Sequence, residues 1–170
     1  MEKNMKKVAV VALCCAFLGS TLLAAQKQSP ASGKKIEALF KAGEIPFTSS
    51  EEGSYVAVIT VEEGESDRFH VYLSTIGNDP NDEKLQVAQL YFLLGALPKD
   101  APVPIVLTKQ IAEWNANLTV GKVVVIGSAI LYTSSLWLSR TDADGLAQDA
   151  VLGHYLSKSL RKEVAPYLKP

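Results

Sequence analysis

The sequence predicts an α+β domain in which helices pack on one antiparallel sheet. Residues 55–76 and 121–138 each contain two runs rich in β-branched residues with a short turn between them, which is the pattern of a β-hairpin. The stretches between and around these hairpins carry apolar residues at helical spacing. The chain lacks the strand–helix–strand rhythm of a parallel sheet, so the expected order is α-ββ-α-α-ββ-α.

The first half of the domain is expected to hold one helix and one hairpin. Residues 34–42 predict an amphipathic helix, and residues 55–61 predict a strand. An acidic turn over 62–67 leads to a returning strand over 68–76, in which apolar and polar side chains alternate. The side chains expected on the buried side are Ile36, Leu39, Phe40, Phe69, Val71 and Leu73.

Two helices are expected in the middle of the chain. Asp79 can cap a helix that Pro80 begins, and the apolar residues that follow predict that this helix runs over 79–97. Three prolines make residues 98–104 a loop. A second helix over 105–118 is expected to bury Leu107, Ile111, Trp114 and Leu118.

A second hairpin and a long helix complete the domain. Gly127 and Ser128 separate two apolar strands, and glycine at the first central position suits a type II′ turn. The last helix is expected over 142–164, where Thr141 and Asp144 have the spacing of a capping box. Its expected buried stripe is Leu152, Leu156 and Leu160.

The N-terminus predicts a secretory signal peptide over residues 1–25. Three lysines precede 18 uncharged residues, 8–25, and the small residues Ala24 and Ala25 offer a cleavage site. The same 18 residues are near the shortest length that spans a bilayer, so an uncleaved anchor in the inner membrane is the alternative. We therefore expect a periplasmic or secreted protein of the bacterial envelope.

The rest of the chain is expected to be a polar linker, 26–33, and one domain, 34–168. Cys14 and Cys15 lie inside the signal segment, so a chain cut after Ala25 is expected to have no disulfide, thiol nucleophile or thiolate metal site. Residues 26–170 carry 14 Lys and Arg against 17 Asp and Glu. This excess of acid argues against nucleic acid as a partner.

One part of the sequence resembles a known family. Trp114–Asn117 end a helix, Gly121 and Lys122 precede an apolar strand, and a second strand ends with Ser135–Leu138 before a leucine-rich helix. This pattern resembles the YbjN-like family, whose domain is similar to that of type III secretion chaperones. The resemblance implies a helix–sheet module that binds other proteins, often as a dimer, and it implies no catalytic residues.

No motif assigns a catalytic, cofactor-binding or metal-binding residue. His70 and His154 are the only histidines, and nothing in their spacing brings them to each other or to a carboxylate, so both are expected to be half-exposed. Asp142–Gly145 resembles the start of a calcium loop but lacks the later ligands, which favours helix capping. The seven carboxylates from Glu44 to Asp67 predict a solvated loop and hairpin tip, with an acidic docking surface or a loose cation site as the alternatives.

The stretch 90–97 is apolar on every side of the helix expected there, whereas packing on a sheet needs only one apolar side. The second side must be covered by the helix over 105–118 or by a protein partner or a second copy of the chain. The residues expected to bind such a partner are Tyr91, Phe92, Leu94 and, near the end of its strand, Trp137.

These observations favour an exported, non-enzymatic, dimeric protein-binding module with a chaperone-like or regulatory role. The alternative is a small periplasmic ligand-binding protein, with an apolar pocket between sheet and helices. Its pocket would be lined by Tyr55, Tyr72, Tyr132 and Trp114. A hydrolase that uses carboxylates and a histidine is a third hypothesis.

Overall fold

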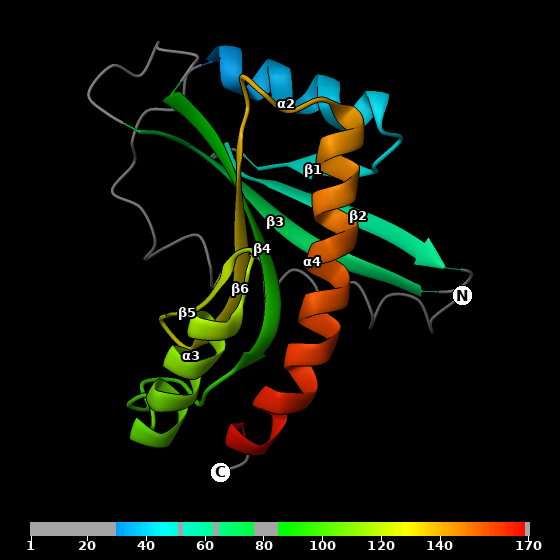
Figure 1. The fold of residues 1–170 in the computed structure, drawn as a ribbon. Helices are drawn as coiled ribbons and strands as arrows, with labels where there is room; N and C mark the ends of the chain where they lie inside the picture. Colours follow the sequence, from blue (N-terminus) through cyan, green and yellow to red (C-terminus); the bar gives the residue numbers. More distant parts are fainter. Residues whose placement is uncertain (1–29, 51–52, 63–64, 77–84, 169–170) are drawn as a thin grey trace, which may run out of the picture.

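An antiparallel sheet organises the computed structural model, which describes residues 30–50, 53–62, 65–76 and 85–168 (Figure 1). Within these residues the sheet has six strands in the order β1-β2-β3-β4-β6-β5. The elements in chain order are α2 (Pro30–Ala42), β1 (Phe47–Ser49), β2 (Tyr55–Glu62), β3 (Glu65–Thr75), β4 (Gln86–Ala96), α3 (Ile105–Asn117), β5 (Lys122–Ile126), β6 (Ala129–Trp137), α4 (Ala143–Val164) and the short η2 (Ala165–Tyr167). The α+β class predicted from the sequence is confirmed.

The strand β4 occupies the place where a helix over 79–97 was expected, so that prediction is wrong. β4 pairs with β3 on one side and with β6 on the other. In β4 the side chains toward α4 and several of those on the opposite face are apolar, so the strand forms an apolar run that periodicity alone does not distinguish from a buried helix. The two apolar sides expected of a helix at residues 90–97 are therefore the two faces of the strand β4. The helix-start signal at Asp79 and Pro80 lies outside the described residues.

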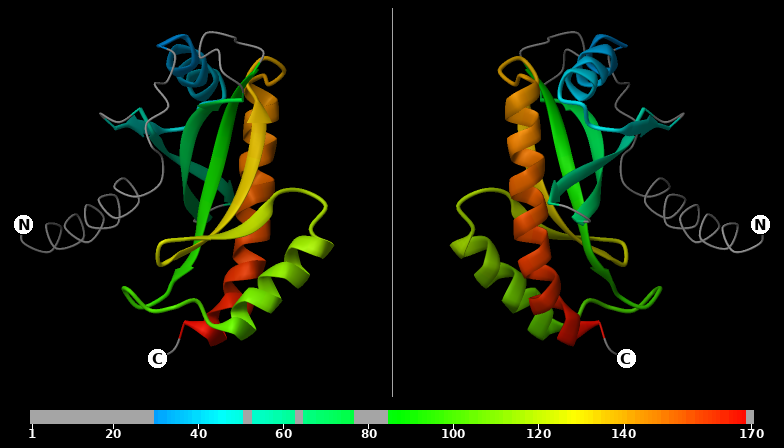
Figure 2. Two further views of the ribbon diagram at one scale, coloured as in Figure 1. Left: turned by 90° about the vertical axis from the view of Figure 1, so that its left-hand side faces the viewer. Right: turned by 90° about the vertical axis from the view of Figure 1, so that its right-hand side faces the viewer.

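The helices of the described chain share one side of the sheet. α4 crosses its middle, where Gly153 lies against the ring of Phe92. α2 packs on β2 through Phe40 and Tyr55. α3 lies beside the end of α4, and Figure 2 shows both helices on the same side of the strands. The core between these layers contains Phe40, Phe69, Val71, Leu90, Phe92, Tyr132 and Leu146, all fully buried.

The N-termini of the helices α2 and α4 differ from those expected. α2 begins at Pro30, so residues 30–33 of the expected linker belong to the helix. Asp142, not Thr141, caps α4: its Oδ1 accepts a hydrogen bond of 2.8 Å from the backbone N–H of Gly145. No helix in the described ranges is long and apolar enough to span a bilayer, and the expected signal or anchor lies outside those ranges.

The buried stripe of α4 is also displaced from the expected one. Leu160 is buried, but Leu152 is 39% exposed on the outer side of the helix. The buried stripe contains two polar side chains that no apolar pattern reveals, His154 and Ser157. Its other members are Leu146, Ala150, Gly153, Leu160 and Val164.

The segment that carries the family resemblance joins α3 to the sheet edge. Trp114 Nε1 donates a hydrogen bond of 2.6 Å to Glu163 on α4. The side chain of Asn115 makes two hydrogen bonds with the backbone of Val123 on β5, accepting from its N–H at 2.6 Å and donating to its carbonyl at 2.9 Å. Gly121 between them has φ +71°, which glycine adopts without strain. These contacts explain why Trp, Asn and Gly occur at this spacing.

Candidate functional site

The face of the sheet opposite α4, which we call the open face, is the strongest candidate for a binding site. Neighbouring side chains of a strand point to opposite faces, so the residues that alternate with the core lie here. Strand pairing places one row across all the described strands. Its members are Thr48, Val56, His70, Tyr91, Thr133 and Lys122.

Two tyrosines form the rigid centre of the open face. The rings of Tyr72 and Tyr91 meet edge to face, with centroids 5.5 Å apart. The hydroxyl of Tyr91 donates a hydrogen bond of 2.7 Å to Gln89 Oε1, two residues earlier on β4. Partial burial raises the pKa of Tyr91, against the opposing effect of a hydrogen bond with Thr133. The hydroxyl therefore stays protonated and acts as a fixed, neutral polar group.

Apolar side chains surround this centre. Trp137, at the end of β6, is 41% exposed, and Leu93 on β4 is 39% exposed. Beneath them Val87 and Leu131 are buried between their neighbours. Half-buried aliphatic residues extend the surface to the outer strands; they are Val56, Val58, Val124 and Ile126. The strand register places Trp137 beside Val87, and Leu93 lies six residues further along β4, so the two exposed side chains lie at opposite ends of a row that also contains Gln89, Tyr91 and Ser135. An apolar surface of this extent is typical of an interaction site, whereas a single exposed apolar residue needs no explanation.

The charged groups of the open face are basic. Arg68 and Lys122 are exposed at its two sides, and His70 lies beside Tyr91. Burial lowers the pKa of His70, so this imidazole is neutral at pH 7. Among the open-face residues whose side chains the structure describes, none is a carboxylate.

The structure separates the four residues expected to bind a partner. Tyr91 and Trp137 both lie on the open face, on β4 and β6. Phe92 and Leu94 are buried, with exposed fractions of 0% and 5%. The helix expected over 79–97 would expose part of its apolar surface, whereas in the strand β4 these two side chains form the core under α4. They are therefore not available to a partner in this fold.

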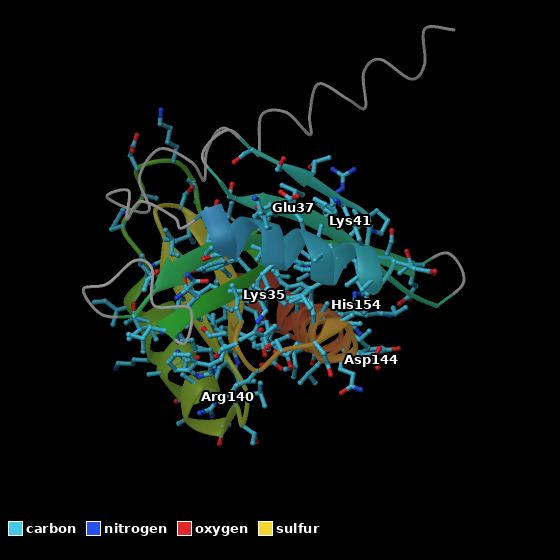
Figure 3. All side chains as sticks on the ribbon, turned by 90° about the horizontal axis from the view of Figure 1, so that it is seen from above. Lys35, Glu37, Lys41, Arg140, Asp144 and His154 are labelled. Carbon is cyan, nitrogen blue, oxygen red and sulfur yellow. The ribbon has the colours of Figure 1, made fainter. Side chains whose placement is uncertain are left out.

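A polar cluster that the sequence analysis missed lies on the other face, between β3 and α4. Asp67 accepts hydrogen bonds from Ser157 Oγ at 3.2 Å and from Arg161 at 3.0 Å, and its Oδ2 lies 3.3 Å from His154 Nδ1. Figure 3 shows His154 on α4 from above. His154 is only 4% exposed, so the expectation of a half-exposed histidine is wrong for this residue. The acidic run is accordingly not all solvated.

This polar cluster has the residue types of a hydrolase but not the geometry. In a Ser-His-Asp relay the serine hydroxyl bonds to the imidazole nitrogen that faces away from the aspartate. Here Ser157 bonds to Asp67 itself, and Ser157 is fully buried. His154 Nε2 instead lies 3.5 Å from Glu65, too far for a good hydrogen bond.

Ion pairs complete the polar cluster and fasten the first hairpin to α4. Lys158 binds Glu65 at 2.7 Å, and this hydrogen bond is the main cause that lowers the pKa of Glu65. Arg161 also donates from Nε to the carbonyl of Leu93 on β4. In the described part of the chain no group of three His, Cys, Asp or Glu side chains could hold a metal ion. The cluster thus joins β3, β4 and α4.

The four aromatic residues expected to line a ligand pocket do not come together. Tyr55 and Tyr132 face the helices, where burial is the main cause that raises each pKa to about 12. The hydroxyl of Tyr55 donates to Glu37, and that of Tyr132 donates to the carbonyl of Val120. Tyr72 lies on the open face, and Trp114 lies on α3.

Comparison with known proteins shows a similarity of fold alone. No protein-family model and no curated protein sequence matches this chain. A chain of the solved "Structure of the HopA1-SchA Chaperone-Effector Complex" is similar, with a TM-score of 0.48 and 11% identity over 79% of this chain and 98% of that chain. Membership of the YbjN-like family stays a prediction.

Proposed function

We propose that this domain is a non-enzymatic module that binds a segment of another protein across the open face. The observation that carries the proposal is the apolar surface around the Tyr72–Tyr91 pair, with Leu93 and Trp137 more than a third exposed. Trp and Tyr are the side chains that most often dominate protein interfaces. Two of the residues that sequence analysis selected for partner binding, Tyr91 and Trp137, belong to this surface.

The free energy gained by burying one side chain shows that a partner must contact several of them. Complete burial of a side chain of this kind is worth roughly 1.5–3 kcal/mol, and those of the open face are already about half buried. A single anchor therefore contributes on the order of 1 kcal/mol, whereas a dissociation constant of 1 μM requires about 8 kcal/mol. A partner must therefore contact several side chains of the open face together, so a test variant should replace two of these side chains at once.

The chaperone-like or regulatory role and the export expected from the sequence remain part of this proposal. The dimer expected from the family resemblance is assigned to another surface. Two copies meeting through the open face would bring together Arg68, Lys122 and their counterparts, and the described side chains of that face include no carboxylate to compensate them. The open face is therefore proposed to hold a different protein.

The test begins with a photo-reactive amino acid at Ser135, an exposed open-face position, in the full chain in its native host. A protein that crosslinks there is then purified, and its affinity for the full chain is measured by calorimetry. The double variant Leu93→Ser/Trp137→Ser should weaken binding at least tenfold while the circular dichroism spectrum stays native.

A matched control is available on α4. Leu152 has the same exposed fraction as Leu93, 39%, but lies on the outer side of the helical layer. Leu152→Ser should leave the affinity unchanged. The proposal fails if no protein binds in a way that depends on the open face, or if Leu152→Ser weakens binding as much as the double variant does.

A further inference from the structure

We propose that the segment held on the open face is apolar at its centre and carries carboxylates on both sides. This inference rests on the proposed function and adds the chemistry of the partner. Its basis is the placement of two cations, Arg68 and Lys122, on either side of Tyr91: neutral His70 is the neighbour of Tyr91 on β3, and Lys122 lies on the far side on β5. Arg68 lies two residues before His70 on the same face of β3.

The basic groups flank the apolar centre at a defined separation. Three strand spacings of about 4.8 Å separate β3 from β5 through β4 and β6, so the strand that carries Arg68 and His70 lies roughly 14 Å from the strand that carries Lys122. Between them lies the uncharged part of the row, Tyr91 and Thr133. A bound segment with carboxylates at its two sides would meet Arg68 and Lys122 while its apolar centre covers Tyr91.

The two described carboxylates that precede Arg68 on β3 are engaged on the other face. Asp67 precedes Arg68 but turns toward α4, where Arg161 binds it at 2.9 Å. Glu65 likewise pairs with Lys158. Within the described residues no carboxylate lies within ion-pair distance of Arg68 or Lys122. The two cations are thus positioned to pair with a carboxylate from outside the domain.

Other occupants fit these charges less well. A second copy would oppose basic groups to basic groups. A nucleic acid or an anionic membrane is bound through many cations, whereas the described side chains of the open face include two permanently charged cations, in a chain whose formal net charge is −1. An apolar segment without charge would remove part of the water around Arg68 and Lys122 at the rim of the contact without giving either cation a carboxylate partner.

The experiment selects binders of the full chain from a displayed library of random 12-residue segments, at low ionic strength. Wild-type protein should enrich apolar segments with Asp or Glu on both sides, and added salt should weaken them. Arg68→Glu/Lys122→Glu should bind those segments at least tenfold more weakly and should instead enrich Lys and Arg at the same places. Lys35→Glu/Lys109→Glu, which reverses two exposed charges on α2 and α3, is the control and should behave as wild type.

Three results would overturn the inference, and they differ in what they mean for the proposed function. Enriched segments without acidic flanks, whose binding still needs Leu93 and Trp137, would refute the charge argument and leave protein binding in place. Self-association that Leu93→Ser/Trp137→Ser abolishes would identify a second copy as the occupant. No segment whose binding depends on the open face would contradict both proposals.

Discussion

Gly153 of α4 lies directly on the ring of Phe92 of β4, so close that a Cβ at position 153 would overlap the ring. This contact sets the distance between the helix and the sheet, and it requires glycine in the middle of a long helix. Gly153→Ala should therefore destabilise the domain by about 1–3 kcal/mol through overpacking, although alanine favours helix by roughly 1 kcal/mol. Urea unfolding measures the difference.

The companion variant identifies the cause. Phe92→Leu removes the ring edge that Gly153→Ala meets, so the double variant should lose less stability than the sum of the two single variants. If the two losses in the free energy of unfolding add, the contact between residue 153 and the ring of Phe92 is not the reason why Gly153→Ala destabilises the domain.

Asp67 is the centre of the polar cluster that fastens the first hairpin to α4. Asp67→Asn keeps the shape but turns an N–H group toward the donors of Arg161 and Ser157, so the free energy of unfolding should fall by about 1.5–3 kcal/mol. Glu65→Gln disturbs a more exposed pair, with Lys158, and should leave stability near that of wild type. Equal losses in the free energy of unfolding would mean that the burial of Asp67 does not make its contacts more stabilising than those of the more exposed Glu65.

His70 should make the stability of the domain depend on pH. Burial lowers its pKa in the folded state below the unfolded value near 6.5, so the unfolded chain binds more protons between these two values. This contribution to stability is complete above pH 6.5 and is lost as the pH falls toward the folded pKa. NMR titration of the two histidines should show a depressed midpoint for His70, and His70→Gln should remove its share of the pH dependence. A midpoint at or above 6.5 would contradict the burial of this imidazole.

Asn115 should protect the exposed edge of β5. Asn115→Ala removes both hydrogen bonds to Val123, so amide exchange at Val123 should accelerate and stability should fall by about 1–2 kcal/mol. The matched control is Asn117→Ala, because Asn117 donates only to the exposed carbonyl of Glu113 within the same helix. Unchanged exchange at Val123 in Asn115→Ala would refute the role of Asn115 at this edge.

Sequence patterns predicted those parts of the fold that local chemistry determines. Glycine at position 127 has φ +59° in the turn of the second hairpin, as a type II′ turn requires. The sequence of β4 predicts a helix because the apolar run 90–97 fits both states, and only the pairing of β4 with β3 and β6 distinguishes them.

The four residues expected to bind a partner rest on two different arguments. Tyr91, Phe92 and Leu94 follow from a helix that is apolar on every side, and in a strand only Tyr91 of the three lies on the open face. Trp137 follows from its residue type and its place near the end of a strand, which the structure retains. The contact between Asp67 and His154 joins residues 87 positions apart in sequence. No local pattern records such a contact, although a histidine among the leucines of the last helix was the available signal.

The central claim is that the open face binds another protein, and its most direct test is the affinity of the protein that crosslinks at Ser135. Calorimetry with the full chain should give at least a tenfold loss for Leu93→Ser/Trp137→Ser and no loss for Leu152→Ser. Equal affinity for the wild type and the open-face double variant, with both proteins folded, would contradict the account.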